Sequence, residues 1–148
     1  MGEKDYNAPM HTAEHILNGT IDKLFGCGRA FSSHVEKKKS KCDYHFDRPL
    51  TEEEIQKIEN TVNEVISRNL DVTEDFIGRE EAEQQFNLSR LPESAGEMLR
   101  IIRIGDYDAC PCIGTHVQNT SEIGRFKIIS SDYNEGVLRI RFKREENI

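Results

Sequence analysis

The sequence lacks any long apolar segment, and this absence excludes a membrane-spanning helix. Mean hydropathy is -0.67, hydrophobic residues make up 36% of the 148 residues, and no apolar run approaches the roughly 20 residues that cross a bilayer. The first residues also lack the apolar core of a signal peptide, and Tyr6 stands where a myristoylation signal requires Ser or Thr. We therefore expect a cytoplasmic protein with no membrane partner.

Cysteines are few, and acidic residues outnumber basic ones. The four cysteines, Cys27, Cys42, Cys110 and Cys112, are too few and too unevenly spaced for a disulfide framework. We expect reduced thiols, and with them metal or catalytic chemistry. The 20 Lys and Arg residues against 27 Asp and Glu leave a net charge of -7, so any contact with nucleic acid must be local.

Apolar spacing predicts two principal helices. Residues 10–25 carry apolar side chains at three- and four-residue intervals, which is typical of an amphipathic helix, and Gly26 ends this helix. The second helix starts at Thr51, where Glu54 completes a capping-box pattern. Its apolar positions continue to about Asn69.

Several shorter segments have the composition of strands, and the sequence contains no repeat, low-complexity segment or linker. We expect a hairpin of residues 29–36 and 40–47, a hairpin of residues 123–131 and 137–143 across a turn at 133–136, strands over 71–78 and 98–104, a short acidic helix over 79–86, and a loop around 92–96. Helices and hairpins without regular strand-helix alternation predict an α+β fold with a mainly antiparallel sheet.

Two short motifs place metal-binding side chains four residues apart. His11 and His15 on the predicted helix lie about 40° apart around its axis, so they can face one ion, although two solvated histidines have the same spacing. Cys112 and His116 repeat the interval in a glycine-containing loop. Three imidazoles and one thiolate suit tetrahedral zinc, structural or catalytic. Cys110 competes with Cys112 as the thiolate; we prefer Cys112 because its interval to His116 matches that of the histidine pair.

The first motif also has a rival interpretation. Residues 11–15 match the H-x-x-E-H pattern of inverted zinc peptidases, in which the glutamate, here Glu14, is a general base. That pattern requires a distant acidic third ligand and contains no second Cys/His pair. We therefore favour the four-ligand interpretation.

The motifs resemble those of the editing domain shared by alanyl- and threonyl-tRNA synthetases and by the free-standing AlaX-type trans-editing proteins. The similarity rests on residues 11–17, 112–117 and 120–128, and it extends from about residue 10 to 143. It implies that residues 1–148 form a single editing-type domain, with an α+β fold similar to the synthetase second additional domain. It also implies zinc held by His11, His15, Cys112 and His116.

The resemblance further implies a function. Proteins of this family hydrolyse the ester that joins a wrong amino acid to tRNA, without ATP, and so maintain the fidelity of translation. The form of residues 114–116 resembles the alanyl branch, whose mischarged substrates are serine or glycine on alanine tRNA. One departure is Ile113, where the family commonly has Gly, and it predicts a tighter or shifted pocket.

Other residues are candidates for contacts with the substrate. A hydroxyl group in the pocket can select serine, because a site built to hydrogen-bond a substrate hydroxyl rejects analogues that lack it. Thr115, beside Gly114, is the first candidate, followed by Ser33 and Ser32. For the tRNA we expect two basic groups, for which the alternative is an ordinary solvated surface. They are the lysine cluster (Lys37, Lys38, Lys39 and Lys41) and the β-strand cations (Arg139, Arg141 and Lys143).

Two alternatives to an aminoacyl-tRNA deacylase stay open. A non-catalytic module would keep zinc for its structure and bind tRNA or a protein without hydrolysing an ester. A metal-dependent hydrolase of another small ester or amide would turn over without tRNA. Ester hydrolysis separates the deacylase from the first alternative, and the requirement for tRNA separates it from the second.

Overall fold

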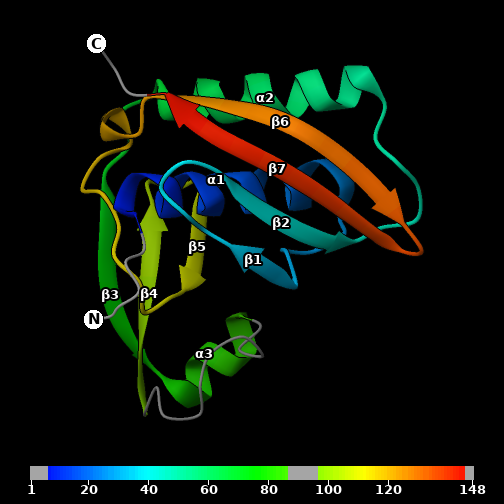
Figure 1. Cartoon of the computed structure of the whole chain (residues 1–148). Coiled ribbons are helices and arrows are strands. Elements are labelled where there is room, and N and C mark those ends of the chain that lie inside the picture. The colour runs from blue at the N-terminus through cyan, green and yellow to red at the C-terminus, as the bar shows by residue number, and fades with distance from the viewer. Residues whose placement is uncertain (1–6, 87–96, 146–148) are drawn as a thin grey trace.

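The computed structural model describes residues 7–86 and 97–145, and within them helices and two antiparallel sheets form the expected α+β fold (Figure 1). In chain order the elements are α1 (Ala8–Phe25), β1 (Ser32–His34), β2 (Ser40–His45), α2 (Glu52–Ile66), β3 (Val72–Gly78), α3 (Arg79–Gln85), β4 (Met98–Ile104), β5 (Asp108–Pro111), the 3-10 helix η2 (Thr120–Glu122), β6 (Arg125–Asn134) and β7 (Val137–Glu145). The loop expected around residues 92–96 lies outside the described residues.

Both principal helices begin at the capping residues that stabilise them. The Asn7 side chain caps the start of α1, and Gly26 ends the helix with φ of 68°, a conformation that costs glycine little. At the start of α2, Thr51 and Glu54 form the expected reciprocal capping box. The expected end at Asn69 is too late, because α2 stops before it and Asn69 itself adopts a φ of 54°.

The strands form two sheets rather than one. The four-stranded sheet has the order β1-β2-β7-β6 and the three-stranded sheet the order β3-β4-β5, with every pair antiparallel. The expected hairpins are β1–β2 and β6–β7, but the second starts later than predicted because Ile123 caps η2. Its turn contains only Glu135 and Gly136, which have φ of 46° and 88° and fit the twist of a two-residue hairpin. Strand β5 and η2 were not predicted.

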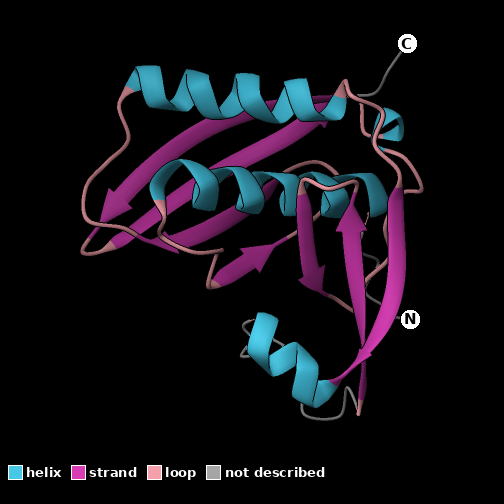
Figure 2. Ribbon diagram, turned by 180° about the vertical axis from the view of Figure 1, so that it is seen from behind, coloured by secondary structure: helices cyan, strands magenta, loops and turns pink. Residues whose placement is uncertain are grey.

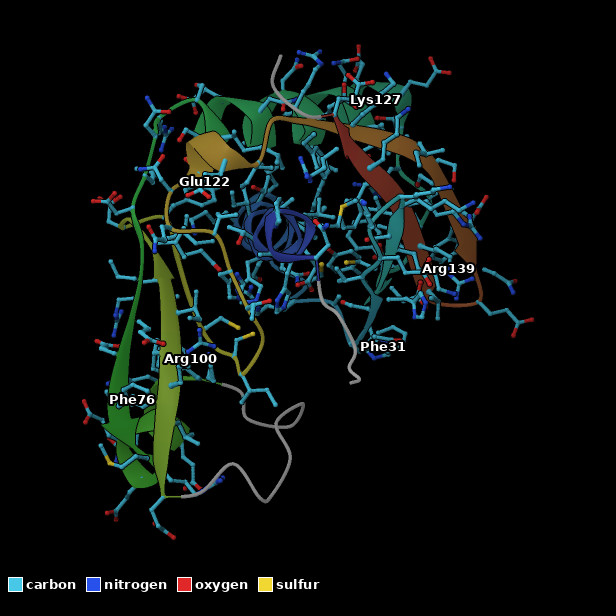
Figure 3. All side chains as sticks on the ribbon, turned by 60° about the vertical axis from the view of Figure 1, so that its left-hand side comes forward. Phe31, Phe76, Arg100, Glu122, Lys127 and Arg139 are labelled. Atoms are coloured by element: carbon cyan, nitrogen blue, oxygen red, sulfur yellow. The ribbon has the colours of Figure 1, made fainter. Side chains whose placement is uncertain are left out.

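Helix α1 lies at the centre of the molecule. Figure 2 shows α1 and α2 covering the same face of the four-stranded sheet, and Figure 3 shows α1 nearly end-on, with strands on two sides of it. All residues from Met10 to Ile21 are buried, so α1 has no fully solvated face along this length. Polar side chains in this stretch must therefore find partners inside the fold.

Strand β5 approaches α1 closely at Gly19. A Cβ atom there would lie 2.8 Å from Oδ1 of Asp108, the first residue of β5. Asp108 is held in place by Arg29, whose Nη1 and Nη2 donate to its two oxygens at 2.8 and 3.2 Å. This packing places the segment that follows β5 beside the first half of α1.

None of the described helices is long and apolar enough to cross a membrane.

Candidate metal centre

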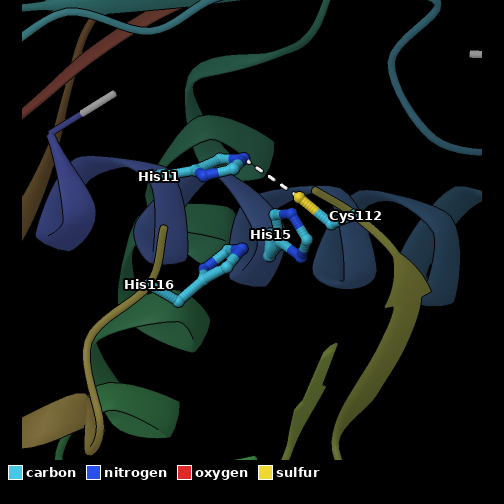
Figure 4. Close-up of side chains that lie close together, drawn as sticks. All are labelled: His11, His15, Cys112 and His116. Atoms are coloured by element: carbon cyan, nitrogen blue, oxygen red, sulfur yellow. Dashed lines mark hydrogen bonds between the residues drawn. The ribbon is translucent and has the colours of Figure 1, made fainter. Parts of the chain in front are cut away.

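The structure brings together the four residues that the sequence analysis named as metal ligands. One donor atom from each of His11, His15, Cys112 and His116 lies within 4.8 Å of the others (Figure 4). The three imidazole rings have centroids 4.2 to 4.9 Å apart. Cys110, the competing thiol, lies on β5 and does not belong to this group. The two motifs thus meet at one point although about a hundred residues separate them.

Helix α1 contributes two histidines, and their four-residue interval places both on the same side of the helix. His11 and His15 are 7% and 4% exposed, and they face the loop that follows β5 rather than solvent. Nδ1 of His11 lies 3.1 Å from the carbonyl oxygen of Thr115. Because a carbonyl only accepts, Nδ1 carries a proton, and in the neutral form of the ring Nε2 then keeps its lone pair. That Nε2 lies 3.5 Å from Sγ of Cys112.

The loop of residues 112–116 is held against α1 by contacts that the sequence analysis missed. Nη1 of Arg100, on β4, donates to the carbonyl oxygens of Cys112 at 3.1 Å and Gly114 at 2.7 Å. Thr12 Oγ1 lies 2.9 Å from Nδ1 of His116 and accepts the N–H of Val117 at 3.2 Å. Such contacts orient ligating side chains from outside the metal shell. No sequence signal identified them, because they depend on how β4 and the loop pack.

The donor set fits a zinc ion. Nε2 of His116 is buried and has no hydrogen-bond partner within the described residues, which is costly unless a ligand occupies it. Burial lowers the pKa of His116 to about 3, with a further contribution from His11, so its ring is neutral. Burial raises the pKa of Cys112, opposed by the Gly114 N–H. Three imidazoles and a thiol that loses its proton on binding match the ligands that zinc prefers.

Gly114 has a packing role that its prediction as a substrate contact did not include. A Cβ atom at this position would lie 2.4 Å from Cε1 and 2.8 Å from Nδ1 of His11. Glycine is therefore required for the loop to pack against the imidazole. The neighbouring Ile113 is 66% exposed, so most of its side chain lies at the surface.

The predicted hydroxyl candidates lie in different environments. Ser33 is half-buried, and its Oγ donates to Oε2 of Glu14 at 3.0 Å. Glu14 is 4% exposed and lies between the two histidines of α1, 3.9 Å from Nε2 of each. Thr115 and Ser32 are exposed. Of the three hydroxyls, that of Ser33 therefore belongs to the buried surroundings of the centre.

The two predicted basic groups come together on the outer face of the four-stranded sheet. Lys41 on β2 pairs in register with Arg141 on β7, next to the exposed turn that carries the rest of the lysine cluster. The inner residues of β7 are buried in the core, so its cations point away from α1; Arg139 and Lys127 mark this region in Figure 3. Asp43 binds Arg139 at 2.7 and 2.9 Å, which offsets part of the positive charge.

Comparison with known proteins identifies relatives of this fold. Residues 99–141 match the model of the threonyl and alanyl tRNA synthetase second additional domain. The chain is 39% identical over 132 residues to the alanine-tRNA ligase of Fervidobacterium nodosum, covering 88% of this chain and 15% of that protein. It is 37% identical over 137 residues to that of Aeropyrum pernix (89% and 15%), and 33% identical over 147 residues to that of Bdellovibrio bacteriovorus (98% and 16%).

The chain is a relative of the alanyl- and threonyl-tRNA synthetase editing domains. It spans about 15% of the length of the ligases that it matches. The matched family segment contains Cys112 and His116, whereas His11 and His15 lie outside it and reach the same point through the fold. The chain is therefore related to a tRNA synthetase domain, and its described residues include a His/Cys cluster that could hold a metal.

Proposed function

We propose that this editing-domain relative is a zinc-dependent aminoacyl-tRNA deacylase that acts in trans on mischarged alanine tRNA, with serine or glycine as the amino acid removed. In this proposal residues 1–148 act as one domain with its core at about residues 10–143. The convergence of His11, His15, Cys112 and His116 within 4.8 Å supports it most directly. The relationship to synthetase editing domains supports tRNA as the substrate carrier.

Hydrolysis of an aminoacyl ester requires few catalytic groups, so a small site is sufficient. An aminoacyl ester is already activated, so the protein needs mainly to position the carbonyl group and a water molecule. A bound zinc ion would supply a Lewis acid for the carbonyl or the water. In this proposal Ser33, which is half-buried beside Glu14, binds the hydroxyl of a serine substrate, whereas Thr115 is exposed. Burial thus favours Ser33 over Thr115 as the selecting hydroxyl.

The tRNA contacts in this proposal are electrostatic. The lysine cluster and the β-strand cations together offer a basic surface on the outer sheet face, despite the overall charge of -7. Arg141 is bound by Asp132, and Nζ of Lys143 lies 3.9 Å from Glu145. We therefore expect the exposed lysines of the β1–β2 turn, at positions 37–39, to contribute more to tRNA binding than the paired cations of β7.

The test is release of serine from seryl-tRNA(Ala) by the purified, zinc-loaded protein. Alanyl-tRNA(Ala) is the comparison substrate, and seryl methyl ester tests whether tRNA is required. The matched variants are His15→Ala, which removes a ligand of the centre, and Cys110→Ala, which removes a nearby thiol outside it. Selective release by the wild type and Cys110→Ala, but not by His15→Ala, is the expected result. Absence of release from a folded, metal-loaded wild type refutes the proposal.

One observation favours a second candidate function. Four protein donors fill a tetrahedral zinc shell, which is typical of structural rather than catalytic sites. A zinc-containing module that binds tRNA or a protein without turnover would have this arrangement. It predicts that chelation unfolds the protein and that seryl-tRNA(Ala) is bound and released intact.

A further inference from the structure

Glu14 is a buried carboxylate in the wall of the candidate metal centre that the four-ligand set does not use. Its side chain is 6% exposed, and it lies on α1 immediately before His15 and three residues after His11. A buried carboxylate costs free energy unless polar groups replace its lost water. The contacts of its two oxygens therefore indicate what interacts with its charge.

The two oxygens of Glu14 have different surroundings. Oε2 accepts a hydrogen bond from Nδ2 of Asn18 at 2.6 Å and from Oγ of Ser33 at 3.0 Å. Asn18 is itself fixed, since its Oδ1 accepts from the Ala30 N–H and from the hydroxyl of Tyr44. Oε1 accepts no hydrogen bond from the described residues, and it lies 3.9 Å from the histidine Nε2 atoms on either side. This oxygen retains acceptor capacity at the edge of the centre.

The nearby buried cation does not neutralise this charge directly. Arg29 uses both terminal nitrogens to bind the two oxygens of Asp108. Within the described residues, Glu14 forms no ion pair with a lysine or arginine; its ion-pair partners within 4 Å are His11 and His15. The fold therefore holds a buried carboxylate beside the centre by hydrogen bonds to one of its oxygens, and its other oxygen can accept from a cationic group of a ligand.

We propose that Oε1 of Glu14 binds the α-ammonium group of the aminoacyl ester. This inference rests on the proposed function, because it takes an aminoacyl ester as the ligand. The α-ammonium group is the cation that seryl and glycyl esters share, and it lies next to the ester carbonyl. A hydrogen bond between two charged groups is roughly twice as strong as a neutral one. Glu14 thus selects esters with a free amino group, whereas recognition of the side chain belongs to other residues.

Binding of two hydrolysis-resistant probes tests the proposal. One is 3′-deoxy-3′-(L-serylamino)adenosine; the other has a hydroxyl group in place of the α-ammonium group. Calorimetry with the zinc-loaded full chain should show the ammonium probe binding about ten- to a hundredfold more tightly. Glu14→Gln should abolish this preference and leave binding of the hydroxyl probe unchanged. The amide oxygen of Gln can still accept from Asn18 and Ser33, so the wall of the site is preserved.

The matched control is Glu59→Gln on α2. Glu59 is half-buried and, like Glu14, hydrogen-bonded, since its Oε1 accepts the N–H of Ile128 at 2.8 Å, but it is not part of the metal centre. This variant should retain the full preference for the ammonium probe. Glu14→Asp, which keeps the charge but withdraws it by one methylene group, should show an intermediate preference.

Three results overturn the proposal. The first is that the wild type binds both probes equally or binds neither of them. The second is that Glu14→Gln still binds the ammonium probe more tightly than the hydroxyl probe. The third is that Glu14→Gln loses its zinc, measured by mass spectrometry, which would assign the carboxylate to metal binding instead. If Glu14→Gln fails to fold, Glu14→Asp decides the matter, because an undiminished preference in that variant would also overturn the proposal. Failure of the proposed function is distinct, because it appears as no serine release from seryl-tRNA(Ala), whereas the probe preference is measured without turnover.

Discussion

Replacing Gly114 by alanine tests whether the loop after β5 positions the metal centre. The added Cβ would lie 2.4 Å from Cε1 of His11. The ring or the loop must therefore move by about 1 Å to reach an ordinary carbon contact of roughly 3.5 Å. The imidazole sits on a fully buried turn of α1 and donates to the carbonyl oxygen of Thr115. It has little room to move without losing that hydrogen bond.

The magnitude follows from these two contacts. Overpacking of this kind costs about 1–3 kcal/mol of folding stability. Displacing a ligand from its orienting hydrogen bond weakens metal affinity by about 10- to 100-fold. Gly114→Ala should therefore bind zinc about 10- to 100-fold more weakly than the wild type, in a competition titration with a chelator. Its melting temperature without metal should also fall.

Two further variants isolate the steric cause. Gly78→Ala is the control, because a Cβ there meets no atom within 4 Å, and its zinc affinity should equal that of the wild type. In a His11→Ala background the clash disappears, so adding Gly114→Ala should cost almost no further stability. Equal zinc affinity in Gly114→Ala and wild type, or fully additive stability losses in the double variant, would refute the argument.

Three other predictions concern the remaining parts of the molecule. Cys112→Ala should sharply lower the zinc content measured by mass spectrometry while Cys110→Ala should not, because only the first thiol belongs to the four-donor group; equal occupancy in both would contradict the ligand assignment. The hydrogen bonds from Arg139 lower the pKa of Asp43 below its ordinary 3.8. The Asp43–Arg139 pair therefore stabilises the fold at pH values above 3.8. This stabilisation is lost as the pH falls through the lowered pKa of Asp43. Asp43→Asn should therefore flatten the dependence of unfolding free energy on pH below about 3.8 in acid titrations by circular dichroism, and an unchanged slope would count against the pairing. Reversing the charges of the lysine cluster should reduce the salt dependence of tRNA binding measured by filter retention; an unaltered slope would remove this cluster from the tRNA surface.

Local patterns in the sequence anticipated most of the elements. The apolar intervals of α1 and the capping box of α2 were correct because they reflect interactions within a few residues of each other. Strand β5 was not predicted, because its four residues, Asp108–Pro111, contain no β-branched side chain. They form a strand only by pairing with β4. The separation of the strands into two sheets is likewise a property of long-range packing.

The sequence by itself determined the helix that carries His11 and His15, the matching interval of Cys112 and His116, and the resemblance to editing domains. Each depends on spacing along the chain. Only the tertiary structure decided that the two motifs meet, that Arg100 and Thr12 orient the loop and that Glu14 keeps one oxygen open. These contacts join α1, β1, β4 and the loop after β5, which are distant in sequence, so they follow from the packing of these elements and not from any local pattern.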